Sequence, residues 1–217
     1  MFKGLAHFYI EGGPLMFVTL TVGLVGLGIA IERAIRYYGD FNFDHAAFMK
    51  KVRQYLVNDQ VDDAIKFCSQ QKKGLTPAIV KAAIERYGCD EELVKANVES
   101  AYLAMTPKVT IRLPYLSLIA NCAVLLGLVG TVYGMISMFG GLGNVDAATK
   151  QAVMSSGIAE ALHNTFQGLF IAVICMILHS ILGAKAAHIV EELDQASSEA
   201  MDWVTLKAFG KLHESAK

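Results

Sequence analysis

Two stretches of the chain decide the fold: VLLGLVGTVYGMISMF at residues 124–139 and GIAEALHNTFQGLFIAVI at residues 157–174. Each stretch places one threonine, Thr131 or Thr165, inside an otherwise apolar helical run. Small residues surround both threonines, and small residues let helices approach one another closely inside lipid. We therefore expect close helix packing at four glycines of these stretches: Gly127, Gly130, Gly134 and Gly168.

The composition predicts an integral membrane protein. Of the 217 residues, 54% are hydrophobic and only 18% are charged, which is too apolar for an ordinary soluble domain. Three apolar runs are each long enough to cross a hydrocarbon core of ~30 Å at ~1.5 Å per helical residue. They are Pro14–Ile31, Leu113–Leu142 and Ile158–Ala184. The sequence therefore predicts an all-α fold with three transmembrane helices, of which the second and third extend into the cytoplasm.

The basic residues predict the orientation. Of the 19 Lys and Arg residues, only Lys3 and Lys150 lie in the N-terminal stub or in the loop between the second and third spans. The positive-inside rule then places the N-terminus in the periplasm and the C-terminus in the cytoplasm. A cleaved signal peptide would carry its positive flank before its apolar run, whereas Arg33 and Arg36 follow this one, so we expect a retained span.

The expected organisation has four parts. A periplasmic stub with the first span (1–31) precedes a cytoplasmic helical segment (32–112). Two channel-forming spans (113–184) and a cytoplasmic C-terminal helix (185–217) follow.

The cytoplasmic segment is expected to form short amphipathic helices between residues 40 and 88, with breaks at Asn58-Asp59 and at 72–76. From Asp90 a longer helix is expected, which Pro107 and Pro114 would kink rather than end. After the third span an apolar stripe repeats at helical spacing: Ile189, Leu193, Ala196, Ala200, Trp203 and Val204. This stripe needs a partner, either the helices of the same chain or those of another subunit.

The two threonines are the strongest candidates for an ion path. If the second span ends near Met138 and the third begins near Ile158, both hydroxyls lie ~10 Å below the outer surface. Hydroxyls at matched depth on neighbouring antiparallel helices can form one polar ring in an oligomer. The alternative is that each hydroxyl bonds a carbonyl of its own helix, which needs no function.

Other polar residues of the spans are weaker candidates. Ionisable groups inside a span are costly, so function is the default interpretation of Glu160, with a carboxylate at the headgroup level as the alternative. His163 lies one helical turn from Glu160 and is a candidate for tuning the path. Ser117 and Asn121 share the helix face of Thr131, further towards the cytoplasm, and are candidates for the same role.

Several classes of function are disfavoured by the sequence. The net charge of −1 argues against a nucleic acid partner. The four cysteines form neither a CxxC motif nor a zinc spacing, so we expect free thiols and no metal site. The sequence contains no GxSxG, no HExxH and no phosphate-binding loop, so we expect neither an enzyme nor a bound cofactor.

The two threonine stretches resemble the signatures of the MotA/TolQ/ExbB proton-channel family, and more narrowly of its ExbB/TolQ branch. The similarity lies in LGLVGTVYGM at 126–135 and in GIAEAL at 157–162, followed by Thr165 and by GLF at 168–170. The resemblance implies a homopentamer in the bacterial inner membrane around two copies of a single-span partner of the ExbD/TolR type. The resemblance also implies that the partner's membrane aspartate carries the proton, and the lack of aspartate in the three spans of this chain agrees with that. Proton motive force would then deliver work to a TonB- or TolA-like envelope protein.

The chain departs from the family pattern at three positions. Val124 and Ile174 stand where prolines are frequent, and His163 stands where relatives are commonly apolar. Sodium therefore stays open beside the proton as the transported ion. Two other classes of function remain as alternatives: a self-sufficient secondary transporter, which would normally show repeated halves, and a membrane scaffold without ion conduction. The energised process is open between uptake, envelope integrity and motility.

Overall fold

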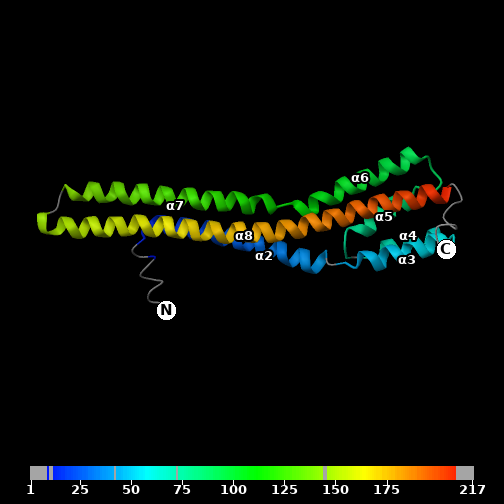
Figure 1. The fold of residues 1–217 in the computed structure, drawn as a ribbon, viewed down its shortest axis with the longest axis horizontal. Helices are drawn as coiled ribbons and strands as arrows, with labels where there is room; N and C mark the ends of the chain where they lie inside the picture. Colours follow the sequence, from blue (N-terminus) through cyan, green and yellow to red (C-terminus); the bar gives the residue numbers. More distant parts are fainter. Residues whose placement is uncertain (1–8, 10–11, 42, 72, 144–145, 209–217) are drawn as a thin grey trace. The chain divides into compact units, whose positions relative to one another are not determined.

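The computed structural model describes residues 9, 12–41, 43–71, 73–143 and 146–208 (Figure 1). The described residues form helices, connecting turns and loops, without strands. The elements are α2 (Pro14–Ile35), η1 (Arg36–Asp40), α3 (His45–Val57), α4 (Val61–Gln70), α5 (Thr76–Ile84), α6 (Glu91–Thr110), α7 (Leu113–Leu142) and α8 (Ala147–Ala208). Three helical stretches of this part of the chain are long and apolar enough to cross a membrane, and they contain α2, α7 and most of α8. The predicted all-α fold with three membrane helices is therefore confirmed.

The chain divides into two compact units. Unit 1 consists of residues 1–33 and 112–182, and unit 2 consists of residues 34–111 and 183–217. Unit 1 contains the apolar parts of α2, α7 and α8, while unit 2 contains the shorter helices.

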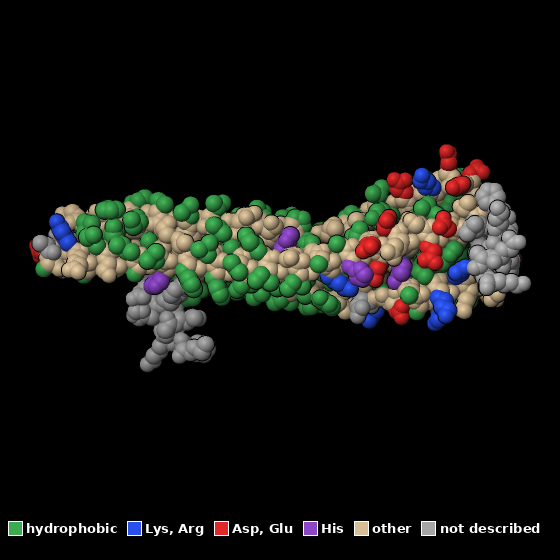
Figure 2. Space-filling model, in the orientation of Figure 1, with side chains coloured by type: hydrophobic (Ala, Val, Ile, Leu, Met, Phe, Trp, Pro, Cys, Tyr) green, Lys and Arg blue, Asp and Glu red, His purple; other side chains and the backbone are tan. Residues whose placement is uncertain are grey.

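In unit 1, α7 runs antiparallel to α8, and α2 runs parallel to α8 (Figure 1). Gly127 of α7 packs against Thr165 of α8, and Gly134, further along α7, packs against Ala161, earlier on α8. Gly23 of α2 packs against Ile171 of α8, and these two helices run in the same direction. The visible outer surface of these helices is mainly hydrophobic, as lipid contact requires (Figure 2).

The buried face of α7 consists largely of small residues spaced three or four apart. It contains Leu116, Ala120, Ala123, Gly127, Gly130, Gly134 and Met138. This spacing places them on one side of the helix, so α7 presents a nearly smooth ridge to its neighbours. Ala120 and Ala123 form a buried cluster with Ala172 and Cys175 of α8.

The helix is interrupted between α6 and α7, where the sequence predicts only a kink. Pro107 remains inside α6, but Arg112 adopts a left-handed conformation with φ of 68°. Pro114 stands in the first turn of α7, where its missing N–H costs no hydrogen bond. In a continuous helix the ring of Pro114 would clash with the carbonyl of Thr110, four residues earlier, which favours an interruption here.

Unit 2 buries its apolar residues among short helices, as the periodicity predicts. The breaks fall at residues 58–60 and 71–75, and Pro77 lies in the first turn of α5. The predicted stripe of α8 is buried at every position, with exposed fractions of 5% or less: Ile189, Leu193, Ala196, Ala200, Trp203 and Val204. Its partner is therefore the chain's own unit 2. The four cysteines are free thiols, as predicted.

Candidate functional site

The candidate site begins with the contact between α7 and α8 in unit 1. A Cβ atom built on Gly168 would lie 2.5 Å from the carbonyl oxygen of Ala123 and 2.9 Å from the Cα atom of Gly127. A Cβ on Gly127 would lie 3.1 Å from the carbonyl oxygen of Asn164, and one on Gly134 would lie 3.2 Å from the backbone nitrogen of Ala161. Real Cβ atoms avoid the shortest of these distances, so the two backbones approach as closely as glycine allows.

The two threonines lie at the edges of this contact and make different hydrogen bonds. The hydroxyl of Thr165 donates across the interface to the carbonyl of Gly127 at 3.4 Å. The hydroxyl of Thr131 donates to the carbonyl of Leu128 in its own helix at 2.6 Å. Thr131 lies one turn, or ~6 Å, beyond Gly127 along α7, so the two threonines occupy neighbouring levels of the bundle. Thr131 thus makes the local type of bond, while Thr165 makes an interhelical one.

Glu160 is partly buried on α8, and its carboxylate lies against Gly13, just before α2. Gly13 has a φ of +74°, and a side chain at this position would overlap Oε1 of Glu160. His163 is half-buried one turn along α8. The structure therefore places Glu160 at the start of α2 rather than on the open surface of the helix.

Ser117 and Asn121 lie on an exposed face of α7. Thr131 lies beside this face and is half-buried, whereas Gly127, Gly130 and Gly134 lie on a separate, buried side of the helix. The structure therefore separates the polar positions of α7 from its packing seam. Among the described residues, no hydrogen bond joins Ser117 or Asn121 to Glu160.

Two buried carboxamides on α8 belong to the same neighbourhood and were missed by the sequence analysis. Asn164 is 2% exposed and Gln167 is 4% exposed, although both lie within the apolar part of α8. Their positions relative to Glu160, four and seven residues later, place all three on one helix face. That spacing is a signal in the sequence, because a polar residue repeated on one face of a membrane helix indicates a polar contact.

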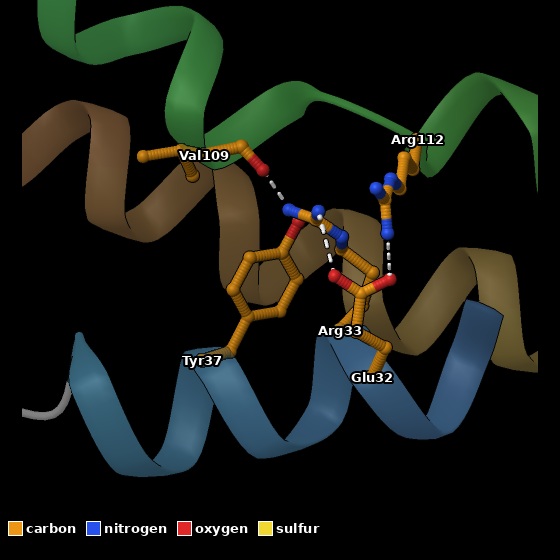
Figure 3. Close-up of polar contacts among 5 residues, drawn as sticks. All are labelled: Glu32, Arg33, Tyr37, Val109 and Arg112. Atoms are coloured by element: carbon orange, nitrogen blue, oxygen red, sulfur yellow. Dashed lines mark hydrogen bonds and ion pairs between the residues drawn. The ribbon is translucent and has the colours of Figure 1, made fainter. Parts of the chain in front are cut away.

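Arg112 is a further residue that the sequence did not single out. Figure 3 shows the Glu32 carboxylate between two guanidinium groups, with one oxygen directed at Arg33 and the other at Arg112. The distance from Arg33 Nη2 to Glu32 Oε1 is 3.4 Å, and the Arg33 side chain is 1% exposed. In unit 2, the Tyr37 hydroxyl donates to the carbonyl of Val109 at 2.7 Å (Figure 3). Within unit 1, Glu32 thus links the end of α2 to Arg112, just before α7. Within unit 2, Tyr37 links η1 to the end of α6.

The described residues contain no group of three or more His, Cys, Asp or Glu side chains that could hold a metal ion. The polar groups of the site are hydroxyls, carboxamides, the Glu160 carboxylate and the His163 imidazole, in an apolar setting. Such groups can exchange hydrogen bonds with a passing ion, a water molecule or a carboxyl group.

The chain is similar to proteins named TolQ and ExbB. Over 124 residues the chain is 32% identical to the Tol-Pal system protein TolQ of Haemophilus influenzae, a match that covers 56% of this chain and 54% of that protein. It is 24% identical over 212 residues to the biopolymer transport protein ExbB of Pseudomonas putida, covering 91% of this chain and 64% of that protein. The matched stretches thus span between half and two thirds of these relatives.

A family model described as the MotA/TolQ/ExbB proton channel family matches residues 71–195, which is more than half of the chain. The matched range contains α7, with Thr131 and three of the packing glycines, and the part of α8 that carries Glu160, Thr165 and Gly168. The predicted resemblance is thereby confirmed. The chain belongs to the MotA/TolQ/ExbB proton channel family, in which it is similar to the TolQ and ExbB proteins.

Proposed function

We propose that this protein is an inner-membrane subunit of an ion-driven complex that energises transport or maintenance of the cell envelope. The driving force is the proton motive force, and the chain acts in transport rather than as an enzyme. Its N-terminus faces the periplasm, and unit 2 lies in the cytoplasm. Family membership and the similarity to TolQ and ExbB support this proposal.

The observation that carries the proposal is the exposure of two polar residues of α7. Ser117 and Asn121 lie within an apolar helix of membrane length, yet neither is covered by the chain's own helices. A polar group facing hydrocarbon without a hydrogen-bond partner costs several kcal/mol. This face therefore borders another chain or an aqueous lumen in the assembled complex.

A homopentamer around a central pore meets this requirement. In it, α7 and α8 line the lumen while α2 packs outside, and the pore holds a single-span partner of the ExbD/TolR type. A TonB- or TolA-like envelope protein receives the work. The smooth glycine and alanine seam of α7 supports this arrangement, because it packs on α8 and leaves the side of α7 that carries Ser117 and Asn121 free for the lumen.

Thr131, Thr165 and Glu160 form the ion path in this proposal. The threonine hydroxyls offer hydrogen bonds to the partner's carboxyl group as it takes up and releases a proton. Glu160 supplies negative charge towards the outer entrance, and His163, Asn121 and Ser117 tune the path. The transported ion is H⁺, and a sodium-driven cycle is the alternative that the test below distinguishes.

The test is partner-dependent ion flux from purified complexes in liposomes. The chain co-expressed with its single-span partner should conduct H⁺, and native mass spectrometry should give five copies of this chain per complex. The chain without its partner should conduct little. Flux driven by a sodium gradient at constant pH would show that Na⁺ rather than H⁺ is the transported ion. A stable monomer or dimer without flux would refute the proposal.

A further inference from the structure

Asn164 uses both hydrogens of its amide group on backbone carbonyls. Its Nδ2 atom donates to the carbonyl of Gly12 at 2.8 Å and to the carbonyl of Glu160 at 3.0 Å. Gly12 stands just before α2, and Glu160 stands one turn earlier on α8. One side chain therefore ties the start of α2 to the turn of α8 that carries the proposed ion-path carboxylate.

Gln167 makes a parallel contact one turn further along α8. Its Nε2 atom donates to the carbonyl of Met16 at 3.1 Å and approaches the Tyr9 hydroxyl at 3.5 Å. The two carboxamides thus hold the carbonyls of Gly12 and Met16, which bracket a single turn. We call residues 12–16 the α2 entry turn.

These contacts fix the orientation of both carboxamides, because only the amino group can donate to a carbonyl. Their oxygens, Asn164 Oδ1 and Gln167 Oε1, are buried and have no hydrogen-bond partner among the described residues. An unpaired buried carbonyl is unfavourable, and Leu or Met would fill similar space without that cost. Packing alone therefore does not account for two carboxamides at these positions.

Gly13 lies between the two held carbonyls and directly against Glu160. Its φ of +74° is a conformation that L side chains rarely adopt, and a Cβ there would overlap Oε1 of Glu160. The carboxylate therefore occupies space that the glycine leaves open. Its location depends on the α2 entry turn keeping this conformation.

We propose that Asn164 and Gln167 are positioning residues, which hold the α2 entry turn on α8 and so keep the Glu160 carboxylate in place against Gly13. This inference rests on the proposed role of Glu160 in the ion path. It assigns to α2 a part in that path, although α2 carries none of the ion-path residues. Release of either carboxamide would free the turn and expose the carboxylate.

The experiment measures the reactivity of Glu160 in the complete complex, with the single-span partner, in lipid nanodiscs. A hydrophobic carbodiimide with an added amine converts accessible carboxyl groups to amides, and mass spectrometry of the fragment containing Glu160 gives the rate. Asn164→Leu removes the hydrogen bonds, and Asn164→Asp keeps the shape while replacing the donor by an oxygen. Gln167→Met tests the second contact. Leu162→Met is the matched control, because Leu162 lies on the same helix and is 62% exposed.

Loss of these hydrogen bonds should raise the rate of Glu160 labelling by about five- to tenfold in both Asn164 variants and by less in Gln167→Met. Hydrogen exchange at residues 12–20 should rise in the same variants, and partner-dependent flux should fall. The control should stay within about twofold of the unaltered chain in each measurement.

Two results separate the failure of this inference from the failure of the proposed function. Unchanged Glu160 labelling in Asn164→Leu and Asn164→Asp complexes that assemble normally would overturn the positioning role. Wild-type flux in Glu160→Gln would instead remove Glu160 from the ion path, while the labelling result would still decide whether the carboxamides hold its side chain.

Discussion

The hydroxyl of Thr165 on α8 donates to the backbone carbonyl of Gly127 on α7 at 3.4 Å. Because Gly127 lacks a side chain, the two helices approach closely enough for this carbonyl to accept a bond from outside its own helix. The contact is long and is therefore weak enough to be exchanged for another partner. A hydroxyl with a weak resting partner suits a residue that must bond transiently to a moving carboxyl group or ion.

Alanine at Gly168 should be the most damaging small substitution in the bundle. The added methyl group would meet the carbonyl oxygen of Ala123 at 2.5 Å, and a backbone atom cannot move aside as a flexible side chain can. We expect a loss of about 1–3 kcal/mol in stability and a lower yield of assembled complex. Thermal unfolding in detergent, followed by size-exclusion chromatography, measures both.

Gly140→Ala is the matched control for this prediction, because a methyl group there would meet no atom within 4 Å. It should leave assembly intact. Equal stability of the two variants would show that α7 and α8 are not in backbone contact at Gly168.

Glu32→Gln should destabilise the protein more than Arg112→Gln does. Glu32 is an acceptor for the buried Arg33 side chain, which is 1% exposed, whereas the Arg112 side chain is 50% exposed. Removing the carboxylate leaves a buried guanidinium with less compensation, at a cost of about 1–3 kcal/mol. Loss of the exposed partner should cost at most about 1 kcal/mol and depend on salt. Thermal unfolding at low and high ionic strength measures both losses of stability. A larger loss in Arg112→Gln than in Glu32→Gln would contradict the prediction.

Cys68 should resist alkylation while the protein is folded. Burial raises the pKa of its thiol to about 12, and the positive charge of Lys81 offsets only part of this rise. The thiolate, which is the reactive form, is therefore scarce at pH 8. Iodoacetamide should modify the exposed Cys89 first and reach Cys68 only after unfolding, as peptide mass spectrometry can show.

The same shift predicts how stability depends on pH. The pKa of a thiol in the unfolded chain is about 8.5, so below that pH both states are protonated and Cys68 adds no pH dependence. Above it the unfolded chain loses its proton first, and stability falls until the folded thiol titrates at about 12. Between pH 8 and 10 this loss amounts to about 2 kcal/mol. Cys68→Ala should lack it, and an identical pH dependence in both proteins would contradict the assigned cause.

The three membrane helices and the packing glycines could be predicted because they follow from local composition and spacing. A run of apolar residues has to cross the membrane whatever its neighbours do, and glycines spaced at helical intervals permit close approach on any partner. The same reasoning separates α3, α4 and α5, since Asn58, Asp59 and Gly74 are weak helix formers.

The roles of Asn164 and Gln167 could not be predicted in the same way. Which face of α8 meets α2 depends on how three helices pack together, and periodicity within one helix contains no information on that choice. The hydrogen-bond partner of Thr165 could not be predicted for the same reason, because it depends on the register of α7 against α8. The left-handed Arg112 was missed because two prolines seven residues apart indicate a kink, while the position of the break depends on tertiary contacts.

Partner-dependent ion flux through the threonine variants tests the central claim most directly. Valine matches threonine in volume but has no hydroxyl, whereas serine keeps the hydroxyl and loses a methyl group. We predict that Thr131→Val and Thr165→Val assemble normally but abolish flux at matched protein levels. The serine variants should keep much of it, and Glu160→Gln should be intermediate. Flux at the wild-type level in both valine variants would contradict an ion path at Thr131 and Thr165.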